Sequence, residues 1–292
     1  MPDFATPEPI SAVIDLVMGD VRIAAGDRHN TVVEVRPRDP GRRADAAAAE
    51  EARVEYDAGR LLIKTTRRWR SYSPFSDGGS VDVHVQLPTG SRVTGTGEMT
   101  AFRCTGSLGD CRLKTAFGDI QVDGAARVEL TTSAGDISVG RATGHAEIST
   151  GTGALQIDAL EDSGVVKNSN GDSHVGEATG DLRVKAANGD IAIDRSRASV
   201  VAKTANGDIR IGGVCRGSIV AETGLGAVEI AIADGTAAWL DLDTKYGHLH
   251  NTLDAAGPPG PGDDSVEVRG RTAYGDITIR RSDPPAPVDP TG

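Results

Sequence analysis

Hydrophobic and polar residues alternate along most of this chain, and the alternating runs recur at a regular interval. Most runs begin just after a glycine, and the glycine is usually followed by aspartate. The recurring glycines are Gly118, Gly135, Gly153, Gly171, Gly189, Gly207, Gly226, Gly247 and Gly275. Their successive spacings are 17, 18, 18, 18, 18, 19, 21 and 28 residues. The chain therefore contains a repeat of about 18 residues, with insertions near its end.

Positions at a fixed distance from each glycine carry the same kind of residue. Apolar residues stand two and four positions after it, which is the period of a half-buried strand. A second alternating run precedes the glycine, and a threonine usually stands three positions before it. A small residue about nine positions before the glycine marks a second corner. Each repeat is thus expected to contain two short strands and two turns.

These repeats predict an all-β fold, a parallel β-solenoid with about 18-residue coils and two short strands per coil. No segment with helical periodicity separates the strands, which excludes βαβ crossovers. Equivalent residues of neighbouring coils should then stack about 4.8 Å apart in continuous columns. An antiparallel sandwich is the competing fold, but it would not require the same columns at a fixed period.

The region before the repeats departs from this pattern. Residues 1–9 are expected to be flexible, and residues 10–90 to form a β-rich coil and cap with a short helix near 44–52. Within it, residues 10–23 match the repeat once. The solenoid coils should occupy 91–281, with a loop insertion at 254–265, and 282–292 should be a disordered Pro-rich tail. The loop and the last coil are expected to close the far end.

Composition narrows the functional classes. Only 3% of the 292 residues are aromatic, which suits a thin core, and the formal net charge is −11. This charge disfavours nucleic acid and anionic lipid as partners. No apolar run is long enough to span a bilayer, so no membrane insertion is expected. The start of the chain lacks the pattern of a signal peptide, and the three cysteines show no metal spacing, so a cytoplasmic protein with reduced thiols is expected.

The repeated T-x-x-G-D-I-x-V coils, an earlier G-D-V-x-I coil and a strand ending in L-P-x-G at Leu87 to Gly90 together resemble the bacterial DUF4097 proteins. That family carries the labels "putative adhesin" and β-strand-repeat protein. The resemblance covers roughly residues 10–281 and implies a right-handed β-solenoid. It brings no established catalytic residues.

Three consecutive coils carry the densest polar pattern, which we name the Lys–Asn–Asp stripe. Its residues are Lys167, Lys185, Lys203, Asn170, Asn188, Asn206, Asp172, Asp190 and Asp208. The stripe could bind an acidic polymer, a sugar or a protein, although mutual charge compensation also explains it. The wider row of aspartates that follow the glycines could hold Ca²⁺, but turn chemistry is favoured, with each carboxylate accepting a backbone N–H.

Three smaller groups of residues are weaker candidates for a site. His248 and His250 lie two apart on a strand, and Asp276 shares the column of His248, which suggests Zn²⁺ but lacks a third strong ligand. Cys215 stands in a corner without an identifiable base, while Cys111 falls in an inward column and should be inert. The segment 67–75 interleaves arginines with aromatic residues, as in single-strand nucleic-acid platforms, but a capping or docking loop is favoured.

The sequence therefore favours a non-enzymatic scaffold that binds a protein partner, with no metal or cofactor. The alternative is a carbohydrate-active β-helix enzyme or a sugar-binding protein that uses the Lys–Asn–Asp stripe. The partner, the process and the oligomeric state do not follow from the residues.

Overall fold

The computed structural model describes residues 2–65, 78–253 and 264–282. Its contacts divide the chain into two compact units, residues 1–172 and 173–292, which are treated one at a time. No helix within the described residues is long and apolar enough to cross a bilayer.

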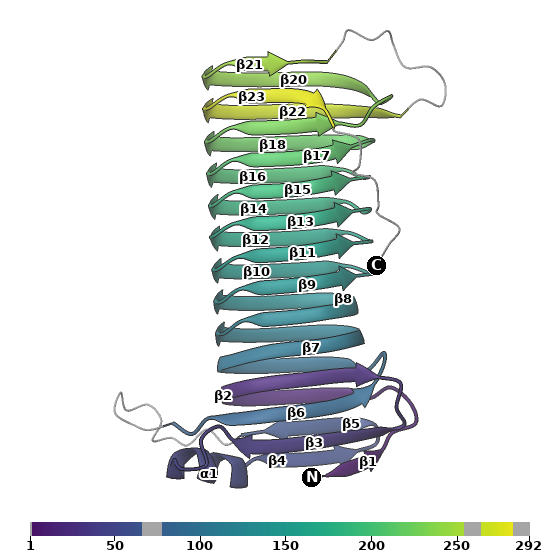
Figure 1. Ribbon diagram of the computed structural model, residues 1–292, viewed down its shortest axis with the longest axis vertical. Helices are drawn as coiled ribbons and strands as arrows, with labels where there is room; N and C mark the ends of the chain where they lie inside the picture. Colours follow the sequence, from purple (N-terminus) through teal and green to yellow (C-terminus); the bar gives the residue numbers. More distant parts are fainter. Residues whose placement is uncertain (1, 66–77, 254–263, 283–292) are drawn as a thin grey trace, which may run out of the picture. The chain divides into compact units, whose positions relative to one another are not determined.

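The repeat forms coils in unit 1 as the sequence predicts. In one coil, β10 (Ala146–Thr152) runs up to the glycine corner and β11 (Leu155–Leu160) leaves it. β10 pairs in parallel with the strands of the coils on either side, and Ala146 lies opposite Gly164, eighteen residues later. β11 pairs in parallel with the equivalent strand of the preceding coil. The prediction of a parallel β-solenoid with two strands per coil is confirmed (Figure 1).

The remaining elements of unit 1 are β1 (Asp3–Ala5), β2 (Ser11–Gly26), β3 (Asn30–Pro37), α1 (Arg43–Glu50), β4 (Arg53–Asp57), β5 (Arg60–Lys64), β6 (Val81–Pro88), β7 (Arg92–Phe117), β8 (Ile120–Ala134), β9 (Ile137–Ala142) and β12 (Gly164–Asn170). β7 and β8 are long because they continue through the second corner of their coils without a break.

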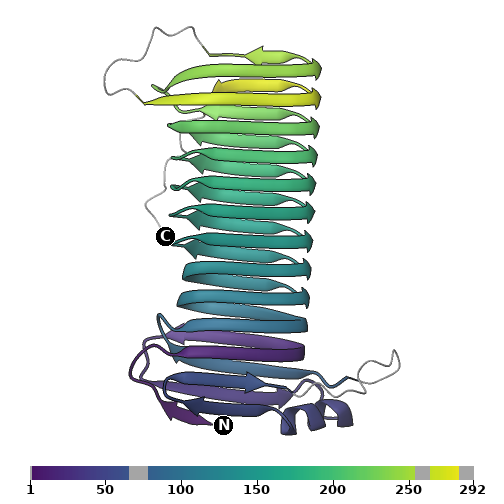
Figure 2. The ribbon, with the colours of Figure 1, turned by 180° about the vertical axis from the view of Figure 1, so that it is seen from behind.

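The first coil of unit 1 is not at the end of the stack. β2 pairs in parallel with β7 on one side and with β5 and β6 on the other. β3 then adds to β6 in antiparallel sense, and β4 adds to β5 in the same way. Figure 2 shows α1 beside these outer strands. The helix is held there by Asp45, whose carboxylate is buried and accepts the backbone N–H groups of Asp39 and Ser80 at 3.1 and 3.0 Å.

Unit 2 repeats the same coil. Its strands are β13 (Ser173–Ala178), β14 (Leu182–Asn188), β15 (Ile191–Ser196), β16 (Val200–Asn206), β17 (Ile209–Val214), β18 (Gly217–Leu225), β19 (Val228–Ile232), β20 (Ala237–Tyr246), β21 (Leu249–Asn251), β22 (Ser265–Tyr274) and β23 (Ile277–Arg281). Strands before the glycine pair with one another, as β14 does with β16, and strands after it do likewise, as β15 does with β17.

The last coil in the sequence is not the last in space, which corrects our expectation for this end. β22 pairs with β18 on one side and β20 on the other, and β23 pairs in the same way with β19 and β21. In Figure 1 the yellow strands accordingly lie between two green coils. Charge explains the order, because Arg271 lies opposite both Glu222 and Asp243. Stacking in sequence order would instead set Asp243 against Glu222, and like charges directly opposite are destabilising.

The core of each unit is a thin layer of aliphatic side chains. The apolar columns on either side of the glycine corner are buried, as at Ile137 and Val139 in unit 1 and at Ile209 and Ile211 in unit 2. Phe102 is the only fully buried aromatic ring among the described residues. The low aromatic content predicted this narrow interior.

Candidate interaction surfaces

The glycine corner has a geometry that only glycine can adopt. Gly207 has φ +143°, and a Cβ placed on it would lie 2.1 Å from the carbonyl oxygen of Gly189 in the preceding coil. Gly135 repeats this arrangement in unit 1, with φ +149° and 2.2 Å to the oxygen of Gly118. The glycine is therefore required both by the positive φ and by the close approach of neighbouring coils.

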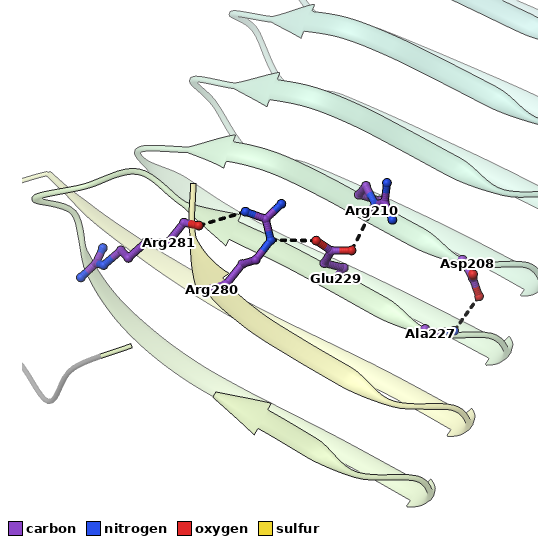
Figure 3. Close-up of polar contacts among 6 residues, drawn as sticks. All are labelled: Asp208, Arg210, Ala227, Glu229, Arg280 and Arg281. Atoms are coloured by element: carbon purple, nitrogen blue, oxygen red, sulfur yellow. Dashed lines mark hydrogen bonds and ion pairs between the residues drawn. The ribbon is translucent and has the colours of Figure 1, made fainter. Parts of the chain in front are cut away.

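The aspartate that follows the glycine serves the next coil. Asp190 Oδ1 accepts the backbone N–H of Asp208 at 2.7 Å, and Asp119 Oδ1 accepts that of Asp136 at 2.9 Å. Asp208 Oδ1 in turn accepts the backbone N–H of Ala227 at 2.7 Å (Figure 3). The turn interpretation of these aspartates is supported, with the donor in the adjacent coil.

Threonine completes the corner from the buried side. The hydroxyl of Thr223 donates to the carbonyl of Gly207 at 2.9 Å, and that of Thr150 to the carbonyl of Gly135 at 3.0 Å. Asn168 takes the threonine's place in one coil, where its amide donates to Gly153 O at 3.0 Å. The three columns thus satisfy the backbone groups of the corner, and this is a structural role.

The Lys–Asn–Asp stripe is divided between the two units. Unit 1 contributes Lys167, which pairs with Glu147 at 3.2 Å, and Asn170, whose amide donates to Gly151 O at 3.4 Å. Asp172 is the last residue of unit 1. The lysine charge in this part of the stripe is therefore already matched by an acid of the preceding coil.

Unit 2 holds the other six residues of the stripe in columns. Lys185 lies opposite Lys203, and Asn188 lies opposite Asn206. The amide of Asn206 donates to Asn188 Oδ1 at 2.8 Å, so the two asparagines form a hydrogen-bonded ladder between these coils. Lys203 pairs with Glu222 at 2.6 Å. Much of the stripe's polarity is thus taken up by the fold, and the geometry alone assigns it no ligand.

A cluster of charges on the other face of unit 2 joins three coils. Glu229 accepts a hydrogen bond from Arg280 Nε at 2.8 Å and another from Arg210 Nε at 3.1 Å (Figure 3). The bond from Arg280 is the main cause that lowers the pKa of Glu229 from its ordinary value, and the positive charges of both arginines add to it. Arg280 also donates to the carbonyl of Arg281 at 3.0 Å. The cluster holds in place the coil of β22 and β23, which stacks out of sequence order and which we name the exchanged coil. This is a structural role.

Unit 2 also carries an apolar feature that the repeat pattern did not predict, which we name the aromatic ridge. It consists of Leu225, Tyr274 and Tyr246, each standing just before its glycine. These residues lie opposite one another in register, and the two tyrosine rings stack with centroids 4.8 Å apart at an angle of 11°. Their exposed fractions are 51, 54 and 66%. Reading the column before the glycine would have revealed the ridge.

Two more apolar side chains are exposed on the outermost coil of unit 2. Trp239 lies on β20 and Leu249 on β21, with exposed fractions of 59 and 51%. The strands that carry them pair on one side only within the described residues. Unit 2 therefore concentrates large apolar surface on its outer coils, and such surface commonly marks an interaction site.

Two of the weaker candidates are the histidine pair beside Asp276 and the segment 67–75. The carboxylate of Asp276 accepts the backbone N–H of His248 at 2.7 Å, and this bond is the main cause that lowers the pKa of Asp276. The rings of His248 and His250 are 6.1 Å apart, and the described residues include no group of three His, Cys, Asp or Glu arranged to hold a metal ion. The segment 67–75 lies outside the described residues.

The cysteines are free thiols. Cys104 and Cys111 are both buried, and a side-chain hydrogen bond between them, together with burial, raises the pKa of Cys104 well above its ordinary value. Cys215 is half-buried, and its Sγ lies 3.7 Å from the carbonyl oxygen of Ser196. A raised pKa suppresses the thiolate, so Cys104 is not arranged as a nucleophile.

Comparisons with protein families and solved structures give the following similarities. The family described as Toastrack DUF4097 matches residues 12–283. A crystal structure of a "putative adhesin" from Bacteroides fragilis covers 95% of each chain at 14% identity, with a TM-score of 0.38. A "putative adhesin" from Parabacteroides distasonis covers 96% of this chain and 95% of its own at 16% identity and TM-score 0.41. A "putative lipid binding protein" from the same organism covers 97 and 96% at 11% identity and TM-score 0.33. No curated protein matches the sequence.

Proposed function

The chain belongs to the Toastrack DUF4097 family, and from that premise we propose that it is a non-catalytic binding module whose aromatic ridge docks a protein partner. The observation that carries the proposal is the row of three exposed apolar side chains, Leu225, Tyr274 and Tyr246, in register on neighbouring coils. Tyrosine and tryptophan dominate the energetic centres of protein interfaces because they bury much area at little entropic cost.

The charges near the ridge favour a protein over a charged polymer. Lys203 is matched by Glu222, and Asp241 by Arg269 at 3.0 Å. These charges are therefore compensated within the fold, and charged residues are depleted at the centres of protein interfaces. The pKa shifts of Glu229 and Asp276 arise from structural bonds, so neither carboxyl indicates catalysis.

The ridge can be tested with a matched pair of variants. Purified wild-type protein, a Tyr246→Ser/Tyr274→Ser variant and a Phe117→Ser control are immobilised and exposed to a native cell extract. Phe117 stands before its own glycine in unit 1 and is 58% exposed, so the control loses a comparable ring elsewhere. We expect at least one protein to bind wild type and control and to be lost from the ridge variant.

Two results contradict the proposal. The first is that no protein distinguishes the ridge variant from the control. The second is a concentration-dependent dimer, measured by light scattering, that the ridge substitutions abolish, because the occupant would then be a second copy of this chain. Circular dichroism of each variant shows whether the fold is retained.

We further propose an intracellular location. Cys104 and Cys111 are in contact yet unbridged, and free thiols of this kind are typical of reducing compartments. Immunoblotting of cytosolic and surface fractions tests this proposal, and recovery of the protein at the cell surface contradicts it.

A further inference from the structure

A surface hollow of about 360 Å³ lies on unit 1, on the strands that leave the glycine corner. It is lined chiefly by Asp20 and Arg22 of β2, by Ala101 and Arg103 of β7, and by Asp119 and Gln121. Phe102 and Ile120 also line it, and both are core residues. The volume falls within the range of small-molecule sites.

Two arginines face each other across the strands of this hollow. Arg22 lies opposite Arg103 in the parallel register, and its other in-register neighbour is His84. Neither arginine forms an ion pair with any residue that the structure describes. Arg103 Nε donates to the uncharged amide oxygen of Gln121 at 3.1 Å.

Arginines at two other positions lie opposite an acid instead. Arg112 lies opposite Glu129 and pairs with it at 2.6 Å, and Arg210 lies opposite Glu229 and pairs with it at 3.1 Å. Like charges directly opposite on adjacent strands are destabilising. A bound anion would relieve the repulsion between Arg22 and Arg103, and two adjacent guanidinium groups suit a planar carboxylate.

The floor of the hollow is open because an alanine replaces an aspartate. Ala101 lies opposite Asp20 in the column that Asp119 also occupies. The small side chain leaves room between the two carboxylates. Asp20 pairs with Arg38 at 3.2 Å and Asp119 accepts the N–H of Asp136 at 2.9 Å, so each is held in place and keeps acceptor capacity for further donors.

We propose that this hollow binds an acidic sugar, with its carboxylate on Arg22 and Arg103 and its hydroxyls donating to Asp20 and Asp119. The amide of Gln121 supplies a further polar contact at the edge. Three aspartates line the hollow, Asp20, Asp119 and Asp136, so a ligand that is only an anion would meet repulsion from them. Sugar hydroxyls can instead donate hydrogen bonds to these carboxylates. The proposal concerns unit 1 and does not depend on the aromatic ridge.

Calorimetric titration with trigalacturonate at low ionic strength tests the site. The protein carries a net charge of −11, so an unspecific attraction of this polyanion is not expected. We expect saturable binding that weakens at least tenfold in Arg103→Gln and at least tenfold in Asp119→Asn. The asparagine retains an oxygen for the N–H of Asp136, which preserves the corner. Arg112→Gln is the control, and its affinity should equal that of wild type.

Binding measurements with other ligands, and with the control variant, can overturn the proposal. Absence of binding overturns it, and so does equal binding of the uncharged maltotriose, since the arginines would then have no part. Inorganic phosphate that binds as tightly as trigalacturonate, and more tightly to Asp119→Asn, indicates a plain anion site and also overturns it. If Arg112→Gln weakens trigalacturonate binding as much as Arg103→Gln does, the attraction is not confined to the hollow, and this result also overturns the proposal.

Discussion

Replacing Gly207 with alanine tests the geometry on which the coils depend. An added Cβ would lie 2.1 Å from the carbonyl oxygen of Gly189 and 2.6 Å from its carbonyl carbon. Non-bonded carbon and oxygen atoms need about 3.2 Å or more, so the two coils must separate locally by roughly 1 Å. The alanine must also adopt φ +143°, a backbone conformation that L residues rarely adopt.

The cost follows from the bonds that close this corner. Two bonds join these coils: the backbone N–H of Gly189 donates to Asn206 O at 2.9 Å, and that of Asp208 donates to Asp190 Oδ1 at 2.7 Å. Lengthening both by ~1 Å removes most of their contribution, about 1 kcal/mol each. The unfavourable φ adds roughly 1–3 kcal/mol. We therefore expect a loss of about 3–5 kcal/mol in the free energy of local opening.

Amide hydrogen exchange is the suitable measurement, because stacked repeats open in parts rather than as one unit. The amides of Asp208 and Ile209 are bonded across the coils, the first to Asp190 Oδ1 and the second to Ala227 O. A loss of about 3 kcal/mol corresponds to roughly a hundredfold faster exchange at these positions. Amides of unit 1 should keep their wild-type rates.

Gly235→Ala is the matched control. Gly235 also lies in unit 2 and has φ +80°, but no atom lies within 4 Å of its would-be Cβ. The control therefore carries backbone strain without the close approach. If Gly207→Ala speeds exchange no more than Gly235→Ala does, the contact between coils is not what requires glycine, and the reasoning is refuted.

Three further outcomes are expected. Asp45→Ala removes the acceptor of the buried Ser80 N–H and of the partly buried Asp39 N–H. It should cost about 2–4 kcal/mol in urea unfolding followed by circular dichroism, whereas exposed Glu50→Ala should have little effect. Thr223→Val keeps the shape but removes the bond to the Gly207 carbonyl, so about 1–2 kcal/mol should be lost by the same measurement, and Thr223→Ser should retain it. The lowered pKa of Glu229 means that its ionised form stabilises the fold at neutral pH. This stabilisation is lost as pH falls from the ordinary range of a glutamate through the lowered pKa. Glu229→Gln should therefore be less stable at pH 7 and lose less stability in acid, and an equal loss in acid contradicts this.

The coil itself could be predicted because three columns repeat without ambiguity. Glycine, aspartate and threonine stand at fixed offsets, and each has one physical task at the corner, so their spacing determined the period and the two strands per coil. The hydrogen-bond donor of each aspartate was harder to predict from the sequence. A turn residue commonly bonds within its own turn, and only coordinates show that Asp190 bonds to the next coil.

The order of the coils and the surfaces were harder to predict. The column four residues before the glycine reads Lys203, Glu222, Asp243 and Arg271 along the chain. Exchanging the last two gives alternating charges, which is the order that the structure adopts. This signal was present but needed the assumption that neighbours in sequence need not be neighbours in space. The Lys–Asn–Asp stripe could be predicted because its residues repeat in every one of three coils. The hollow on unit 1 instead arises where the repeat is broken, because Ala101 stands in the aspartate column.

The exchanged coil has a consequence for synthesis on the ribosome. β20 is translated before β22, yet β22 separates it from β18 in the finished protein. A nascent chain that has emerged only as far as residue 251 therefore holds two strands that must not dock onto each other. Unit 2 can be completed only after residue 281 has been translated, and a chain terminated before residue 265 leaves β18 without its proper neighbour. Within unit 2, the end of translation thus determines when the stack can close.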